Sequence, residues 1–76
     1  MSKVLVPSDD LNQYLFGIYQ YYTEKGFPQN IASGVVRGVI VCFQSVQAAQ
    51  LILDYNRKAF FRVSYNGVNW SSWKEL

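Results

Sequence analysis

The residues of this chain best suited to binding chemistry are aromatic rings that lie close to side-chain amides. The 76 residues include six tyrosines, five phenylalanines and two tryptophans. Such rings offer a large amphipathic contact area at low entropic cost, which suits a contact surface. A sugar presents flat C–H faces and a rim of hydroxyls, so a ring for stacking beside an amide for hydrogen bonding matches it. We expect binding residues among exposed rings and loop positions, namely Tyr21, Tyr22, Phe27, Asn30, Tyr65, Asn66, Asn69 and Trp70.

A second group of side chains near the carboxyl end is expected to support the fold. Phe61 and Arg62 are neighbours in an alternating segment, so they should point to opposite faces of a strand. Arg62 could stack on Trp70 or Trp73 as a cation–π contact, or it could pair with Glu75. Either contact is structural, and Phe61 is given a packing role as well.

The residue types give no support to catalysis or metal binding. The chain has no histidine, and its serines have no evident activating partner. Cys42 is the only cysteine, which rules out an intrachain disulfide, and within the apolar run 39–43 we expect a buried, inert thiol. The carboxylates are expected to cap turns and face solvent: Asp9, Asp10, Glu24, Asp54 and Glu75. We therefore expect no enzyme, no metal and no cofactor.

Charge and hydropathy exclude two classes of partner. The net charge is +2 and the basic residues are scattered, so the concentrated phosphate footprint of a nucleic-acid binder is missing. The apolar runs are far shorter than the ~20 residues that span a bilayer. The amino-terminal residues show no secretory signal, so synthesis in a cytoplasm is expected.

Length and turn residues predict one small domain, residues 1–76, with a thin core. A short helical turn is expected over 11–16, ended by Gly17, because the segment 18–23 is β-prone throughout. The apolar run 39–43 predicts a central strand covered on both faces. Residues 59–65 alternate clearly as a strand and end at Asn66-Gly67, a turn pair that tolerates positive φ.

The segment from Ser45 to Tyr55 fits two structures. Its alanines and glutamines favour a capped helix by propensity, whereas Leu51, Leu53 and Tyr55 would share one face of a strand. We favour the strand, because the strand over 58–65 needs a hairpin partner. The fold class is thus mainly β, a single antiparallel sheet of four to five strands with a short N-terminal helical turn. A helix over 45–55 would make it a small α+β fold.

The order of these segments resembles a known family. The residues DLN at 10–12 precede GIY at 17–19, then come GVIV at 38–41, QLILD at 50–54, FFR at 60–62 and the closing WSSWKEL at 70–76. This order is similar to that of the pyocin-knob domain in tail fibres of bacteriophages and R-type pyocins. The resemblance covers residues 9–76. Since that family closes with this tryptophan pair, the resemblance also implies a structural role for Trp73, as the more buried of the two.

The resemblance implies a structural virion protein, located on the phage tail or another external position. Its knob would take part in attachment to the bacterial surface, through glycan binding or through trimerisation of the fibre. The implied partners are two further copies of the chain, other virion or tail proteins, and a bacterial surface polysaccharide. The alternative is a small decoration, collar or adaptor subunit that docks on capsid or tail proteins without contacting sugar.

Overall fold

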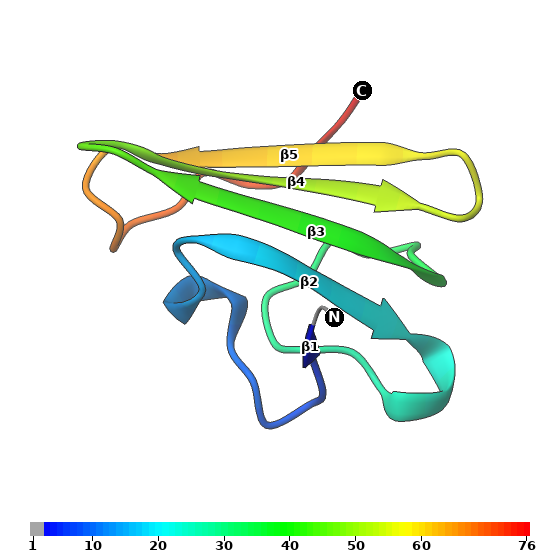
Figure 1. Ribbon diagram of the computed structural model, residues 1–76. Helices are drawn as coiled ribbons and strands as arrows, with labels where there is room; N and C mark the ends of the chain where they lie inside the picture. The colour runs from blue at the N-terminus through cyan, green and yellow to red at the C-terminus, as the bar shows by residue number, and fades with distance from the viewer. Residues whose placement is uncertain (1–2) are drawn as a thin grey trace.

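A computed structural model describes residues 3–76 and shows one six-stranded sheet whose strands follow chain order (Figure 1). The strands are β1 Lys3–Val4, β2 Gly17–Tyr22, β3 Arg37–Gln44, β4 Ala48–Asp54, β5 Ala59–Ser64 and β6 Lys74–Glu75. β1 pairs with β2 in parallel, and every later pair is antiparallel. The mainly β class is confirmed. The sheet is mixed, however, and larger than expected, because a two-residue strand is added at each edge.

The helical segments are shorter than predicted. A 3₁₀ turn, η1, covers Leu11–Gln13 only, and a second, η2, covers Thr23–Lys25 and begins at the last residue of the segment expected to be β-prone. Asp10 caps η1 by accepting a hydrogen bond from the Asn12 backbone N–H at 2.9 Å. Tyr14 then adopts extended angles, so the turn cannot propagate to residue 16.

The 45–55 segment is a strand, which confirms the favoured alternative. β4 pairs on one side with β3 and on the other with β5, so sheet hydrogen bonds along both edges outweigh its helix propensity. Its burial alternates as a strand requires, with Ala48, Gln50, Ile52 and Asp54 buried. Arg57, at φ 64°, turns the chain into β5.

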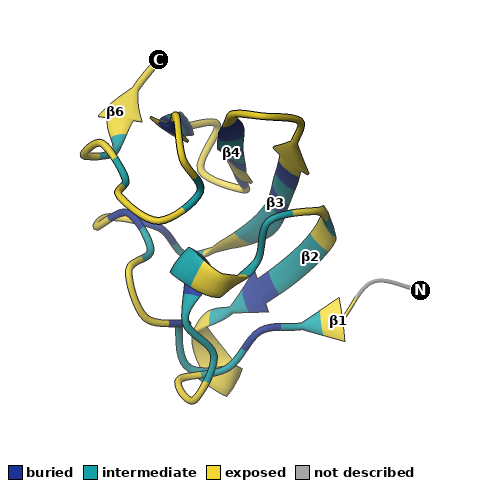
Figure 2. Ribbon diagram, turned by 90° about the vertical axis from the view of Figure 1, so that its left-hand side faces the viewer, coloured by how far each residue is buried: buried dark blue, intermediate teal, exposed yellow. Residues whose placement is uncertain are grey.

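The two faces of the sheet differ in what covers them. The segments between strands, with η1, η2 and β6, lie on one side of β2, β3 and β4 (Figure 2). We call this covered side the inner face and the opposite side the outer face. The core forms where inner-face side chains meet the covering segments: Leu5, Leu11, Tyr21, Ala32, Val35, Ile40, Cys42, Ile52 and Phe60.

Asp54 is a buried anchor for the inner layer. Its carboxylate accepts a 2.6 Å hydrogen bond from the Tyr21 hydroxyl and bonds from the backbone N–H groups of Val36, Arg37 and Asn56. Burial pushes the pKa of Asp54 upward, but these four bonds outweigh it and hold the pKa below 3.8. One carboxylate thus joins β2, the segment before β3, and the β4–β5 turn.

A glycine makes room for this contact. A Cβ on Gly38 would collide with the backbone carbonyl of Leu53 and lie 2.9 Å from the Tyr21 hydroxyl oxygen. The bare glycine lets β4 approach β3 while the Tyr21 ring crosses toward Asp54.

Removing the Asp54 carboxylate should destabilise the whole domain. Asp54→Ala leaves the buried Tyr21 hydroxyl without its acceptor, and we expect a loss of about 3 kcal/mol in the free energy of unfolding. Urea denaturation measures this loss, and Glu75→Ala, at an exposed carboxylate, is the matched control. Equal midpoints for the two variants would contradict the anchoring role.

The same carboxylate predicts acid sensitivity. Because the folded-state pKa of Asp54 is lowered, its contribution to stability is complete above the unfolded pKa of about 3.9 and is lost as pH falls through the folded value. The stability difference between wild type and Asp54→Asn should therefore be largest at neutral pH and shrink below about pH 4. Urea titrations of both proteins at pH 7 and pH 2.5 measure it, and a difference that does not change with pH would refute the assignment.

Candidate functional site

Tyr21 is not the exposed binding ring that the sequence predicted. Its side chain is fully buried on the inner face and its ring packs edge-on against Phe27, with centroids 6.1 Å apart. Burial, together with the hydrogen bond to Asp54, raises the pKa of its hydroxyl. Tyr21 is therefore a core residue, because its position in β2 places it under the covering segments.

Three further predicted binding residues are scattered over the molecule. Tyr22 is half-buried at the end of β2 on the outer face, and its hydroxyl donates to Gln20 Oε1 at 2.8 Å. Phe27 is half-buried against Tyr21. Asn30 is exposed, yet its amide donates to Asp10 Oδ1 at 2.7 Å. The structure does not bring these residues together as one site.

The remaining predicted residues lie in the segment after β5. Tyr65 is 78% exposed, and Asn69 is exposed as well. The side-chain oxygen Oδ1 of Asn66 accepts 2.9 Å hydrogen bonds from the backbone N–H groups of Val68 and Asn69, so this side chain forms the turn. Tyr65 is the ring of this segment that is free for a partner.

Arg62 stacks between both tryptophans, which confirms the expected cation–π contact. Its guanidinium carbon lies 4.4 Å from the Trp70 ring centre and 4.7 Å from that of Trp73. The Trp73 indole N–H donates to the Asn30 carbonyl oxygen at 2.8 Å. Both tryptophans are half-buried. Glu75, the other partner expected for Arg62, is not part of an ion pair among residues 3–76.

A buried polar chain continues from this stack into the core. Arg62 Nε donates to Gln50 Oε1 at 2.8 Å, and the Gln50 amide donates to the carbonyl oxygens of Leu11 and Tyr14. Burial lowers the pKa of Arg62 to about 10, although the negative charge of Asp10 acts in the opposite direction. The guanidinium therefore stays charged at neutral pH, as a cation–π contact requires.

The outer face of the sheet carries a continuous set of apolar side chains that no other described segment covers. Pairing places Val41 between Ile18 and Leu51 across the strands, with Phe61 beyond Leu51. Phe61 thus belongs to this face and is half-buried. The apolar members of the outer face are Ile18, Tyr22, Val39, Val41, Phe43, Ala49, Leu51, Leu53, Ala59, Phe61 and Val63.

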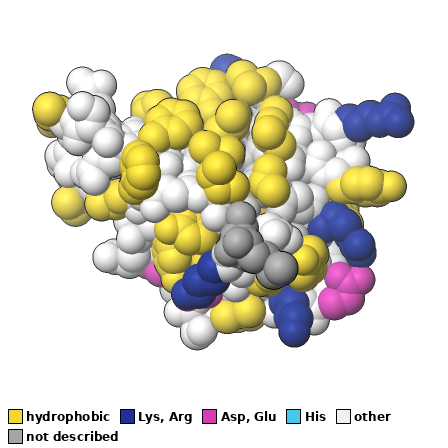
Figure 3. All heavy atoms as spheres, in the orientation of Figure 1, with side chains coloured by type: hydrophobic (Ala, Val, Ile, Leu, Met, Phe, Trp, Pro, Cys, Tyr) yellow, Lys and Arg dark blue, Asp and Glu magenta, His cyan; other side chains and the backbone are white. Residues whose placement is uncertain are grey.

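This face corrects the expectation that the 39–43 strand is covered on both sides. Within residues 3–76 no segment lies over the outer face, where Phe43 is 47% exposed and Leu53 of β4 and Val63 of β5 are about as open. Val39 and Val41 are half-buried. Figure 3 shows apolar side chains gathered across this side of the sheet, with charged ones toward the margins. Strand pairing also places Arg37 on this face, where β3 begins beside the end of β2, and it binds Glu24 at 2.9 Å. Soluble monomers rarely expose a continuous apolar surface of this kind.

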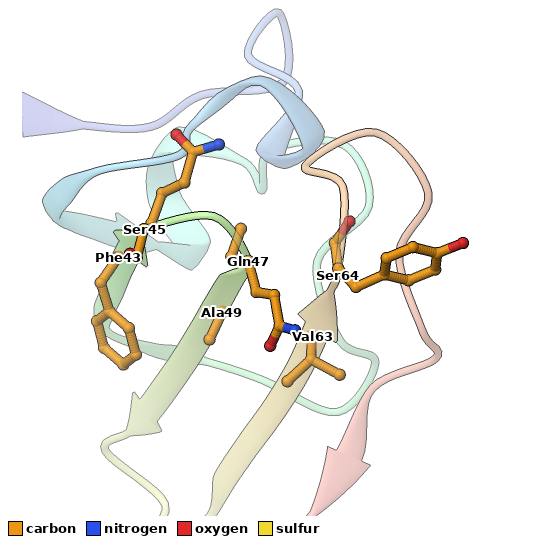
Figure 4. Close-up of a pocket in the computed structure, with 9 residues that line it drawn as sticks. Phe43, Ser45, Gln47, Ala49, Val63 and Ser64 are labelled. Carbon is orange, nitrogen blue, oxygen red and sulfur yellow. The ribbon is translucent and has the colours of Figure 1, made fainter.

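A groove indents one end of the outer face, beside the β3–β4 turn. Its volume is about 340 Å³. Figure 4 shows Phe43 and Val63 on its two sides, with Gln47 between them. Ala49 lies across from both Phe43 and Val63 in the sheet, so a small side chain separates two larger ones.

Three titratable side chains meet among residues 3–76: the Tyr14 hydroxyl donates to Asp9 Oδ1 at 2.6 Å and accepts from Lys3 Nζ at 3.0 Å. No cluster of three or more potential metal ligands occurs among the described residues. Cys42 is buried, as expected, and burial raises the pKa of its thiol to about 11, which disfavours the thiolate. None of the helices described is long and apolar enough to cross a membrane.

Sequence reasoning missed the outer face, although its signal was present. Alternation in β5 placed Phe61 and Val63 on one face, and Leu51 and Leu53 alternate in the same way in β4. The pairing register, which the sequence does not state, aligns these strands into one surface.

Comparison with family models, with curated proteins and with solved structures found no match. The resemblance to the pyocin-knob domain therefore remains a prediction from the residues quoted above.

Trp73→Ala should destabilise the domain, since it removes the stacking on Arg62 and the hydrogen bond to Asn30. We expect a loss of about 2 kcal/mol from these two contacts together. Thermal unfolding measures it, with the exposed neighbour Ser72→Ala as control. An unchanged melting temperature for Trp73→Ala would mean that the tryptophan does not support the fold.

Proposed function

We propose that this chain is a non-enzymatic assembly module, the knob of a phage tail fibre or tail spike at an external position of a virion. Copies of the chain meet through the outer face, and the resulting homotrimer takes part in attachment to the bacterial surface. The single observation that carries the assembly is the uncovered apolar outer face. The fibre context is supported by the ordered residues that resemble the pyocin knob.

Electrostatics favour a second copy of the chain as the partner. Strand pairing places two charged side chains on this face, Arg37 where β3 begins and Lys74 in the edge strand β6. The middle of the face carries none, so two or three copies can approach there without burying like charges. A rim charge such as Arg37 is already bound to Glu24 and need not be desolvated at the centre.

The small size of the domain favours assembly as well. A chain near 60 residues buries only about 60% of the surface that its unfolded form exposes. This chain has one layer of core on one side of its sheet, and a lone cysteine that cannot form an intrachain bridge. Covering the outer face would add a second apolar layer and stabilise the fold by mass action.

The outer face also favours one alternative. A decoration, collar or adaptor subunit would dock the same surface onto a capsid or tail protein and would contact no sugar. In both proposals the outer face is an interface, and they differ in whether the isolated chain covers that face with copies of itself.

A charge at the centre of the outer face should dissociate the assembly. We expect wild type to have three times the mass of one chain in light scattering, and Leu51→Asp to be monomeric, because burying an unpaired carboxylate costs about 3–5 kcal/mol. Val68→Asp makes the same change at a residue that is 72% exposed in the segment after β5, and it should leave the mass unchanged.

The fold of each variant is checked by the fluorescence of Trp70 and Trp73, which lie away from the outer face. A wild type that stays monomeric at every concentration would contradict the homotrimer and favour the docking subunit. A Leu51→Asp protein that keeps the wild-type mass would contradict the outer face as the interface.

A further inference from the structure

One dipeptide in the turn after β5 favours a reaction that the proposed assembly does not involve. Asn66 is the only asparagine of the sequence that precedes a glycine; the others precede glutamine, isoleucine, arginine or tryptophan. The backbone nitrogen after an asparagine can attack the side-chain amide carbon and close a five-membered imide. Glycine has no side chain to hinder this approach and lets the backbone rotate into the required angles. The sequence therefore makes Asn66-Gly67 the pair at which ring closure is least hindered.

The folded turn holds both reacting groups in hydrogen bonds. The backbone N–H of Gly67, whose nitrogen would attack, donates to Ser64 Oγ at 2.8 Å. Oδ1 of Asn66, on the carbon that would be attacked, accepts 2.9 Å bonds from the backbone N–H groups of Val68 and Asn69. The Ser64 hydroxyl donates to the same oxygen at 3.1 Å. Ring closure must break the bond from Gly67 to Ser64 and move the amide carbon away from its donors.

Ser64 is the residue that joins these two sets of bonds. It is the last residue of β5 and is only 3% exposed, so the sheet fixes its hydroxyl beneath the turn. Asn66 itself is exposed, so water reaches the turn as soon as it opens. Because the bonds that close the turn are few and lie near the surface, the turn can open while the sheet stays folded.

We propose that Asn66 is a deamidation site whose rate is set by opening of the turn over residues 64–69. In the open turn the Gly67 nitrogen loses its proton and bonds to Cγ of Asn66, the Cγ–Nδ2 bond breaks, and the amide nitrogen takes up a proton and leaves as ammonia. Water then opens the imide at either of its two C–N bonds, which gives aspartate or isoaspartate. The inference is independent of the proposed assembly, because it uses none of the apolar members of the outer face.

The two products act differently on the tryptophan stack. Aspartate keeps a side-chain oxygen that accepts the same N–H bonds. Isoaspartate routes the backbone through the former side chain and lengthens it by one methylene. The turn leads directly to Trp70, whose ring centre lies 4.4 Å from the Arg62 guanidinium carbon, and the Ser71 N–H bonds to the Val63 carbonyl oxygen at 2.9 Å. A longer turn displaces these contacts, so isoaspartate destabilises the fold and aspartate does not.

The first experiment follows the full chain by mass spectrometry of its proteolytic peptides during incubation at neutral pH. We expect the mass increase of amide loss at Asn66 and not at the other asparagines. The chain unfolded in urea should react there about 10–1,000-fold faster, as expected for an open state populated at about 0.1–10% in the folded protein. Equal rates in the folded and unfolded chain would overturn control by the turn. Equal modification at every asparagine would overturn the site.

Matched serines then test what holds the turn closed. Ser64→Ala removes the hydroxyl that binds both reacting groups, and in the folded protein it should raise the rate at Asn66 several-fold. Ser72→Ala changes an exposed serine beyond the turn and should leave the rate unchanged. Equal rates in wild type and folded Ser64→Ala would overturn the proposal.

Hydrogen exchange of the wild type keeps the proposal testable if Ser64→Ala fails to fold. The factor by which exchange of the Gly67 N–H is slowed, relative to the unfolded chain, should match the factor by which deamidation is slowed. Deamidation faster than the open fraction measured by exchange allows would overturn the proposal.

The products are compared by thermal unfolding. The isoaspartyl form, separated by chromatography, should melt below the wild type, whereas Asn66→Asp, which adds the charge without lengthening the backbone, should melt with it. Equal melting temperatures for the isoaspartyl form and Asn66→Asp would overturn the effect on the tryptophan stack.

Discussion

Among residues 3–76, the segments that cover the sheet lie over only one of its two faces. The small core and the exposed apolar surface both follow from this arrangement. A sheet needs an apolar layer on each buried face, and here the loops, two 3₁₀ turns and β6 supply one such layer. The inner face is closed by a small core, whereas the outer face keeps a full set of apolar side chains with nothing from residues 3–76 over them. The proposed assembly supplies the missing layer.

Polar groups hold the inner layer as firmly as its few apolar side chains do. Asp54 joins β2, the segment before β3 and the β4–β5 turn, while Gln50 connects Arg62 to the backbone around η1. The loops of this layer contribute core residues such as Leu5 and Val35, and hydrogen bonds to the buried Asp54 and Gln50 side chains fix their positions further. The stacking of Arg62 between Trp70 and Trp73 closes the layer at the far end of the chain.

Local patterns in the sequence predicted the individual strands and turns. Which side chains are buried depends on how the strands pair, and the sequence does not state that pairing. The alternation at 59–64 was sufficient for β5, and Gly67, at φ 75°, forms the expected turn. Tyr21 could not be placed, because in the segment 18–23 each of the two alternating faces carries tyrosine and one polar residue, Gln20 on one and Thr23 on the other. Asp54 seemed a surface residue because its three backbone partners come from distant or irregular segments. The apolar run 39–43 predicts that both faces of its strand are covered. Its composition does not show whether the second face is covered by the same chain or by another molecule.

The groove and the outer face are two consequences of one register, since Ala49 makes the hollow and Leu51 continues the apolar surface. The central claim is that the outer face is covered when the protein is in its working state. Methyl NMR of wild type with a soluble paramagnetic gadolinium chelate tests it most directly. The account predicts that the methyl signals of Ile18, Leu53 and Val63, each about half exposed in the single chain, are protected while those of Val68 are broadened. Broadening of the outer-face methyls to the same degree as Val68 would contradict it.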